Sequence, residues 1–181
     1  MYLFFDTETT GLPKNFAAPA SDTANWPRMV QLAWRLMLDE DTLIKEQEYL
    51  IQPDGWDIPP RATEVHGITQ AQAMALGVPL RRALETFTKD VEEAKRLVAH
   101  NIRFDAKIVG AELYRCGMVN VIAQRPHTCT MQMKGRKWAK LGAVYEELFD
   151  KPLEGAHDAL VDTRACAEVF FELKRRGYIR V

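Results

Sequence analysis

The alternation of apolar and polar residues along the chain predicts a mixed α/β domain without internal repeats. A short apolar run over residues 2–6 predicts a buried strand, and alternating apolar positions over 30–38 predict a second. Residues 13–27 between them are rich in Ala, Pro, Asn, Ser and Asp, which is typical of a loop, and the length of this loop suggests function or mobility. Downstream, the pattern predicts strands at 47–51, 97–99 and 128–133, and helices at 80–94, 104–116, 141–148 and 161–173.

The composition is that of a soluble globular protein. The 181 residues fit one domain, 1–181, with 47% hydrophobic and 27% charged residues. No apolar run approaches the roughly 20 residues that cross a membrane, and the N-terminus lacks a secretory signal, so we expect a cytoplasmic protein without membrane contact. The three cysteines, Cys116, Cys129 and Cys166, are far apart, which argues against a disulfide framework and against structural zinc.

The net charge of −1 argues against a protein that coats long stretches of duplex DNA, because such proteins carry a basic face. An enzyme that grips a few terminal nucleotides needs much less positive surface. One local basic cluster contains an aromatic residue, and it offers contacts to phosphates and a base or, as we prefer, forms a solvated helix start. Its members are Lys134, Arg136, Lys137, Trp138 and Lys140.

The first candidate chemistry is Asp6-Thr7-Glu8 at the end of the first predicted strand. Side chains two residues apart on a strand point to the same face, so both carboxylates project together. They repel each other unless a cation lies between them, and Mg²⁺ and Mn²⁺ prefer oxygen ligands. Taken alone, the pair has a simpler interpretation, in which one carboxylate caps a turn and the other faces water.

Two further acidic segments lie where predicted helices begin. Asp105 falls in the first turn of the helix that follows the predicted strand at 97–99. Taken alone, it has a simpler interpretation, in which it caps the helix or places a favourable negative charge near its N-terminus. Asp158 and Asp162 share one face of the last helix. His157 is five residues from Asp162, so it must lie at the cap or in the preceding loop to meet Asp162 over a common site.

These motifs together resemble a known family. Asp6 through Leu12, His100-Asn101 with Phe104-Asp105, and His157 through Asp162 are similar to the three exonuclease motifs of the DnaQ-like 3′→5′ exonucleases, the histidine-containing branch of the DEDD superfamily. Val65 through Thr69 matches a segment common in bacterial proofreading subunits. The resemblance spans residues 2 to about 175. It departs from the family in the long loop at 13–27 and in the end of the chain soon after the last helix, which suggests no polymerase-binding tail.

The resemblance implies a ribonuclease H-like fold, with a mixed central β-sheet flanked by helices on both sides. It also implies that two divalent metal ions, Mg²⁺ or Mn²⁺, are held by Asp6, Glu8, Asp105 and Asp162. In such sites one ion activates the attacking water and the other stabilises the leaving oxygen. His157 is then the catalytic base that takes the proton of the water.

Substrate contacts follow from the resemblance as well. The positions that hold the terminal nucleotide are Thr9, Thr10 and Leu12. The positions that contact its sugar, phosphate or base are His66, Asn101 and Phe104. Phe104 is equally well interpreted as a core residue at the helix start. His100 and His127 match no functional position, and we expect both to be structural or surface residues.

The implied activity is metal-dependent 3′→5′ exonuclease cleavage of single-stranded DNA, releasing nucleoside 5′-monophosphates. A free-standing nuclease and a proofreading subunit that works with a DNA polymerase or another replication or repair protein are both open. An exoribonuclease is the nearest alternative, because nothing in the sequence reads a 2′-hydroxyl. A catalytically idle nucleic-acid-binding subunit is the other, and the complete set of four carboxylates and a histidine argues against it.

Overall fold

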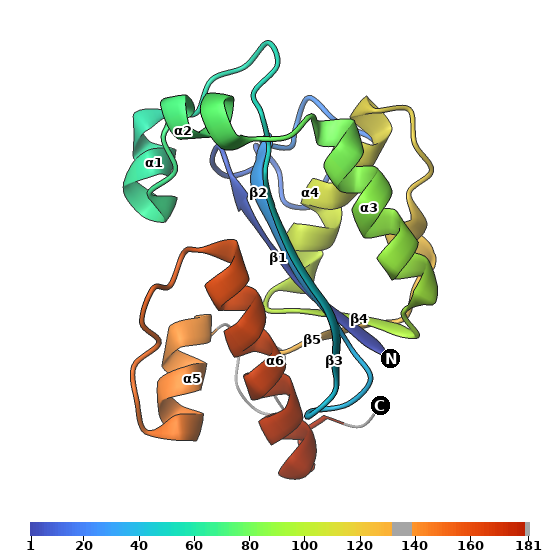
Figure 1. Cartoon of the computed structure of the whole chain (residues 1–181), viewed down its shortest axis with the longest axis vertical. Coiled ribbons are helices and arrows are strands. Elements are labelled where there is room, and N and C mark those ends of the chain that lie inside the picture. The colour runs from blue at the N-terminus through green and yellow to red at the C-terminus, as the bar shows by residue number, and fades with distance from the viewer. Residues whose placement is uncertain (132–138, 180–181) are drawn as a thin grey trace.

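The computed structural model describes residues 1–131 and 139–179, which form a single mixed sheet with helices packed against it (Figure 1). The sheet has five strands in the order β3-β2-β1-β4-β5. β1, β2 and β3 are antiparallel to one another, whereas β4 and β5 run parallel to β1. The strands are β1 (Tyr2–Thr9), β2 (Met29–Met37), β3 (Leu43–Leu50), β4 (Arg96–Ala99) and β5 (His127–Cys129). The helices are α1 (Pro60–His66), α2 (Gln70–Leu76), α3 (Leu80–Glu93), α4 (Ile102–Arg115), the 3-10 helix η1 (Val121–Gln124), α5 (Leu141–Phe149) and α6 (Ala159–Arg175).

Helices cover both faces of the sheet because successive residues of β1 point in opposite directions. Phe5 packs against Phe87 of α3, with ring centroids 5.5 Å apart, and belongs to the main core with α4. Phe4 faces the other way and meets Phe170 of α6, with ring centroids 5.3 Å apart. The predicted sheet flanked by helices on both sides is therefore confirmed.

Most predicted elements are present with shifted ends. β1 continues to Thr9 instead of ending at residue 6, and β3 begins at Leu43 rather than at residue 47. The short helices α1 and α2 were not predicted, because neither has an apolar stripe. α2 does have a local signal, since Thr69 and Gln72 form a capping box.

The region after β5 differs from the prediction. The strand ends at Cys129, and residues 132–133 of the predicted strand lie outside the described residues. The predicted basic cluster is also mostly outside them, since this holds for Lys134, Arg136, Lys137 and Trp138. Its remaining member, Lys140, directly precedes α5.

The loop at 13–27 contains turns but no helix or strand, as predicted. Its own side chains tie it together: the Asn15 amide donates to Asn25 Oδ1 at 2.8 Å, and Asn25 Nδ2 donates to the Asn15 carbonyl at 2.9 Å. Trp26 is buried, and its Nε1 donates to the Pro19 carbonyl at 3.0 Å. The loop is thus a packed part of the structure.

Other predictions about structural residues are confirmed. All three cysteines are free thiols. His100 is buried, with Nδ1 2.9 Å from Thr130 Oγ1 and Nε2 2.9 Å from the Ala139 carbonyl, and His127 is exposed. Across the described part of the chain, no helix combines the length and apolar character that crossing a bilayer requires.

Candidate active site

Asp6 and Glu8 lie on the same face of β1. Both are an even number of residues from Phe4, which packs on α6, so their carboxylates point toward that side of the sheet. In the register of β1 with β2, Asp6 pairs with Ala33 and Glu8 with Gln31. Both residues therefore lie within β1, which continues to Thr9. The prediction that their carboxylates share one face is confirmed.

The start of α6 brings Asp162 and His157 to the same place. Asp158 is the N-cap, and its Oδ1 accepts hydrogen bonds from the Leu160 and Val161 amides, each 3.0 Å long. His157 precedes this cap with a φ of 71°, and its amide donates to Asp162 Oδ2 at 3.2 Å. His157 thus lies in the preceding turn with an exposed side chain, as its five-residue spacing from Asp162 required.

Gln31 of β2 fixes the beginning of α6 and was not predicted as a site residue. It is 1% exposed, and its Oε1 accepts a hydrogen bond from the Ala159 amide at 3.0 Å. Its Nε2 donates to Glu48 Oε1 at 2.7 Å and lies 3.4 Å from Asp158 Oδ2. The sequence did contain a signal for Gln31, since it is a polar residue inside an apolar strand. A buried polar group needs hydrogen-bond partners, and this need could have indicated a structural role.

Asp105 enters from α4 and is held by β1. Its Oδ1 accepts hydrogen bonds from the Thr7 amide at 3.1 Å and the Thr7 hydroxyl at 2.8 Å, and its side chain is buried. Asn101, in the left-handed conformation with a φ of 67°, turns the chain into α4 just before it. Thr7 is a second residue that the sequence did not single out.

Burial, followed by repulsion between neighbouring carboxylates, raises the pKa values in this cluster. Burial, and then the charges of Asp105, Asp162, Glu8 and Asp158, raise the pKa of Asp6 well above its usual value. Burial and the neighbouring carboxylates, first Asp162, raise the pKa of Glu8 to about 8. Burial raises the pKa of Asp105 to about 7 against the opposing hydrogen bonds from Thr7. Burial also raises the pKa of Asp162, opposed by its hydrogen bond from His157.

The donor set fits hard divalent cations. One potential ligand atom each from Glu8, His157 and Asp162 lies within 4.8 Å of the others. Asp162 Oδ1 is buried and has no hydrogen-bond partner among the described residues. Asp6 shares the face of β1 with Glu8, and Asp105 is hydrogen-bonded to Thr7 between them. Oxygen-rich clusters of this kind suit Mg²⁺ or Mn²⁺, whose charge would offset the repulsion.

The residues expected to contact the terminal nucleotide begin with Thr9, the last residue of β1. Thr9 is buried, and its hydroxyl donates to the Gly11 carbonyl at 2.7 Å. The Thr10 amide donates to the Arg28 carbonyl at 2.9 Å. Leu12 is 75% exposed, so an apolar side chain is presented to solvent immediately beyond the carboxylates.

His66, at the end of α1, faces this segment. Its Nδ1 accepts a hydrogen bond from the Ile68 amide at 3.0 Å, so the proton of the neutral ring is on Nε2. That Nε2 is buried without a hydrogen-bond partner among the described residues. Burial lowers the pKa of His66, a weak hydrogen-bonding contact with the Thr9 backbone opposes this, and the charge of His157 lowers it further.

Phe104 packs, partly buried, against the main hydrophobic core. Phe104 is therefore a core residue, as one of the two interpretations expected. Because it is only partly buried, part of its side chain is still accessible at the start of α4. Asn101 is half-buried and makes no side-chain capping bond to α4. Its amide is thus not used by the helix that it precedes.

Comparison with known proteins agrees with this arrangement. Residues 3–170 match the family model RNase T, described as exonuclease. A DNA polymerase III subunit epsilon-like protein of Rhodobacter capsulatus is 31% identical over 184 residues, which cover 97% of this chain and 24% of that protein. The chain thus spans about a quarter of the length of this relative.

Solved structures share the fold. Exonuclease I of E. coli, in complex with a dT13 oligonucleotide, superposes with a TM-score of 0.76 at 20% identity, over 97% of this chain and 41% of that chain. Exonuclease X in complex with 5′ overhanging duplex DNA superposes with a TM-score of 0.66 at 22% identity, over 99% of this chain and 95% of that chain. The ribonuclease H-like fold expected from the motifs is therefore confirmed.

Proposed function

The chain belongs to the exonuclease family, and from this premise we propose that it is a metal-dependent 3′→5′ exonuclease that removes nucleoside 5′-monophosphates from single-stranded DNA. We assign residues 1–181 to one exonuclease domain, of which the family model matches residues 3–170. The polymerase-subunit name of the Rhodobacter relative supports a DNA polymerase as a partner.

One observation carries the proposal. β1, the start of α4 and the start of α6 bring the four carboxylates together. Potential ligand atoms of Glu8 and Asp162 lie within 4.8 Å of each other, and Asp105 is hydrogen-bonded to Thr7, between Asp6 and Glu8 on β1. A buried cluster of like charges costs stability, so it requires a compensating function. Cation binding by all four carboxylates supplies that compensation.

We assign a role to each residue of the cluster. Asp6, Glu8, Asp105 and Asp162 hold the cations, which when bound would activate water and stabilise the leaving 3′ oxygen. His157 takes the proton of the attacking water, and the hydrogen bond from its own amide to Asp162 fixes the backbone from which the ring projects.

The end of β1 and the residues that follow it bind the 3′ end of the DNA. Thr9 and Thr10 hold the terminal nucleotide through the backbone, and Leu12 contacts its base with an exposed apolar side chain. We assign His66, which lies beside Thr9, to contact with an oxygen of the same nucleotide. Asn101 and Phe104 contact the sugar, phosphate or base from the start of α4.

DNA is the favoured substrate because the two compared exonuclease structures hold a dT13 oligonucleotide and an overhanging DNA duplex. RNA is the alternative, since no described residue has been assigned to a 2′-hydroxyl. An idle nucleic-acid-binding subunit would retain the fold without needing four clustered carboxylates.

The decisive test is a time course on 5′-labelled single-stranded DNA and RNA of the same sequence, with Mg²⁺, with Mn²⁺ and with a chelator. We expect a ladder that shortens from the 3′ end, needs metal, is faster on DNA and is absent for Asp6→Asn. A faster reaction on RNA would make the protein an exoribonuclease. Shortening of neither strand, by a folded protein that binds both, would favour the idle subunit.

A further inference from the structure

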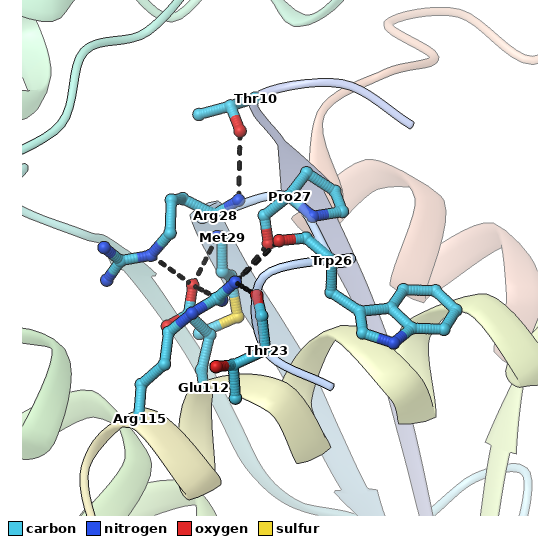
Figure 2. Close-up of polar contacts among 8 residues, drawn as sticks. All are labelled: Thr10, Thr23, Trp26, Pro27, Arg28, Met29, Glu112 and Arg115. Carbon is cyan, nitrogen blue, oxygen red and sulfur yellow. Dashed lines mark hydrogen bonds and ion pairs between the residues drawn. The ribbon is translucent and has the colours of Figure 1, made fainter. Parts of the chain in front are cut away.

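Glu112 joins α4 to the beginning of β2 through one carboxylate oxygen. The residue is 0% exposed, and its Oε1 lies 2.9 Å from the Met29 amide, 3.0 Å from Arg28 Nε and 2.9 Å from Arg115 Nη1 (Figure 2). Its Oε2 has no hydrogen-bond partner among the described residues. Charge-assisted hydrogen bonds are the strong ones, and the buried position shields these from water.

Arg115 connects the same carboxylate to the loop at 13–27. Its Nη2 donates to the carbonyls of Thr23 at 2.5 Å and Trp26 at 2.6 Å, and its Nη1 donates to the Pro27 carbonyl at 3.3 Å (Figure 2). Three carbonyls from one end of the loop thus converge on one guanidinium, whose fork of donors is rigid. The loop end is consequently fixed to the last turn of α4.

Arg28 passes this restraint to the candidate nucleotide-binding segment. Its amide donates to Thr10 Oγ1 at 3.0 Å, and its carbonyl accepts a hydrogen bond from the Thr10 amide at 2.9 Å. This reciprocal pair continues the β1–β2 pairing past the irregularity between Glu8 and Thr9. Figure 2 shows Thr10 directly above Arg28, with Glu112 and Arg115 beneath.

We infer that Glu112 and Arg115 are positioning residues for the 3′-terminal nucleotide, acting through Arg28 on Thr10. The inference rests on the proposed function, since it assigns Thr10 to nucleotide binding. α4 carries Asp105 in its first turn and Arg115 at its end, so one rigid helix holds both a metal ligand and the nucleotide-binding segment. Neither Glu112 nor Arg115 touches the reacting atoms.

The inference is tested with Glu112→Gln, which keeps an acceptor but removes the charge, and Arg115→Lys, which keeps the charge but cannot reach three carbonyls. We expect the KM for single-stranded DNA, and the Kd for a 5′-fluorescent oligonucleotide, to rise on the order of tenfold, as for a lost charge-assisted hydrogen bond. The kcat should change by less than about threefold, because the metal ligands stay in place. Amide hydrogen exchange at Thr10 should become faster in both variants.

Asp90→Asn is the matched control. Asp90 is also a buried carboxylate, 2.7 Å from Lys45 Nζ and 2.6 Å from Trp34 Nε1, but it is not linked to Thr10. All variants are assayed below their melting temperatures. Unchanged KM and Kd in both test variants, or an equal rise for Asp90→Asn, would overturn the inference. If the wild-type protein binds but does not cleave DNA, the proposed activity fails, while the Kd and exchange measurements still decide the positioning role.

Discussion

The Asp105 carboxylate accepts two hydrogen bonds from one residue, Thr7, through the amide at 3.1 Å and the hydroxyl at 2.8 Å. This contact joins residues that are 98 positions apart and fixes α4 against the strand that carries Asp6 and Glu8. Asp105, which we propose as a metal ligand, is thereby oriented by hydrogen bonds from a neighbouring residue, as the ligands of metal sites commonly are.

Replacing Thr7 by Val removes the hydroxyl and keeps the shape of the side chain. We expect the affinity for Mn²⁺ to fall by about 10-fold to 100-fold, because Asp105 loses the shorter of the two hydrogen bonds that orient it. Titrating activity and melting temperature with Mn²⁺ measures this. Thr130→Val, which removes a buried hydroxyl bonded to His100, should leave Mn²⁺ affinity unchanged. Equal losses in the two variants would mean that the Thr7 hydroxyl acts only through stability.

Asp6→Asn should separate activity from stability. We expect cleavage to fall by about 10³-fold or more, since one cation ligand is lost. The metal-free protein should become more stable by on the order of 1 kcal/mol at pH 8, because burial and four nearby carboxylates disfavour the Asp6 charge. Asp90→Asn, which breaks a buried ion pair, should lower stability and leave cleavage unchanged. Chemical denaturation in a chelator and a gel assay in Mg²⁺ measure the two effects, and an active Asp6→Asn enzyme would refute the cation-binding role.

His157→Gln should lower kcat by about 10²-fold to 10⁴-fold with little change in KM, as expected for the loss of a general base. The melting temperature should not change, because the side chain is exposed. His127→Gln provides the control, since His127 is an exposed histidine on β5. Single-turnover rates on a short oligonucleotide measure the effect. A kcat within a few fold of the wild type would assign the proton transfer to another group.

The metal-free protein should lose stability as the pH rises from about 4 to about 8. The pKa of Glu8 is raised from 4.5 to about 8 and that of Asp105 from 3.8 to about 7. In this window the unfolded chain has released protons that the folded protein still binds, so the free energy of unfolding falls with increasing pH. Melting temperatures in a chelator at successive pH values measure the slope, which Glu8→Gln should flatten and Mg²⁺ should reduce. A melting temperature that rises over this range would contradict the raised pKa values.

The sequence by itself determined the local elements and the identity of the candidate residues. Apolar spacing predicted α3, α4 and α6 closely, because a helix that packs on a sheet must repeat its apolar residues every three to four positions. The spacing of Asp6 and Glu8 likewise placed both side chains on one face of the strand, and the five-position separation of His157 and Asp162 required a turn before the helix. Such features depend only on backbone geometry within one segment.

Tertiary structure alone decided what meets across the sheet. The order β3-β2-β1-β4-β5 places α4 and α6 on opposite faces of β1, so that Asp105 reaches Thr7 while Asp162 lies beside Glu8. The roles of Gln31 and Glu112 are equally invisible locally, because their partners are 128 and 83 positions away. A buried polar side chain needs a hydrogen-bond partner. Only the folded chain determines which partner it has, because folding brings distant segments within hydrogen-bonding distance.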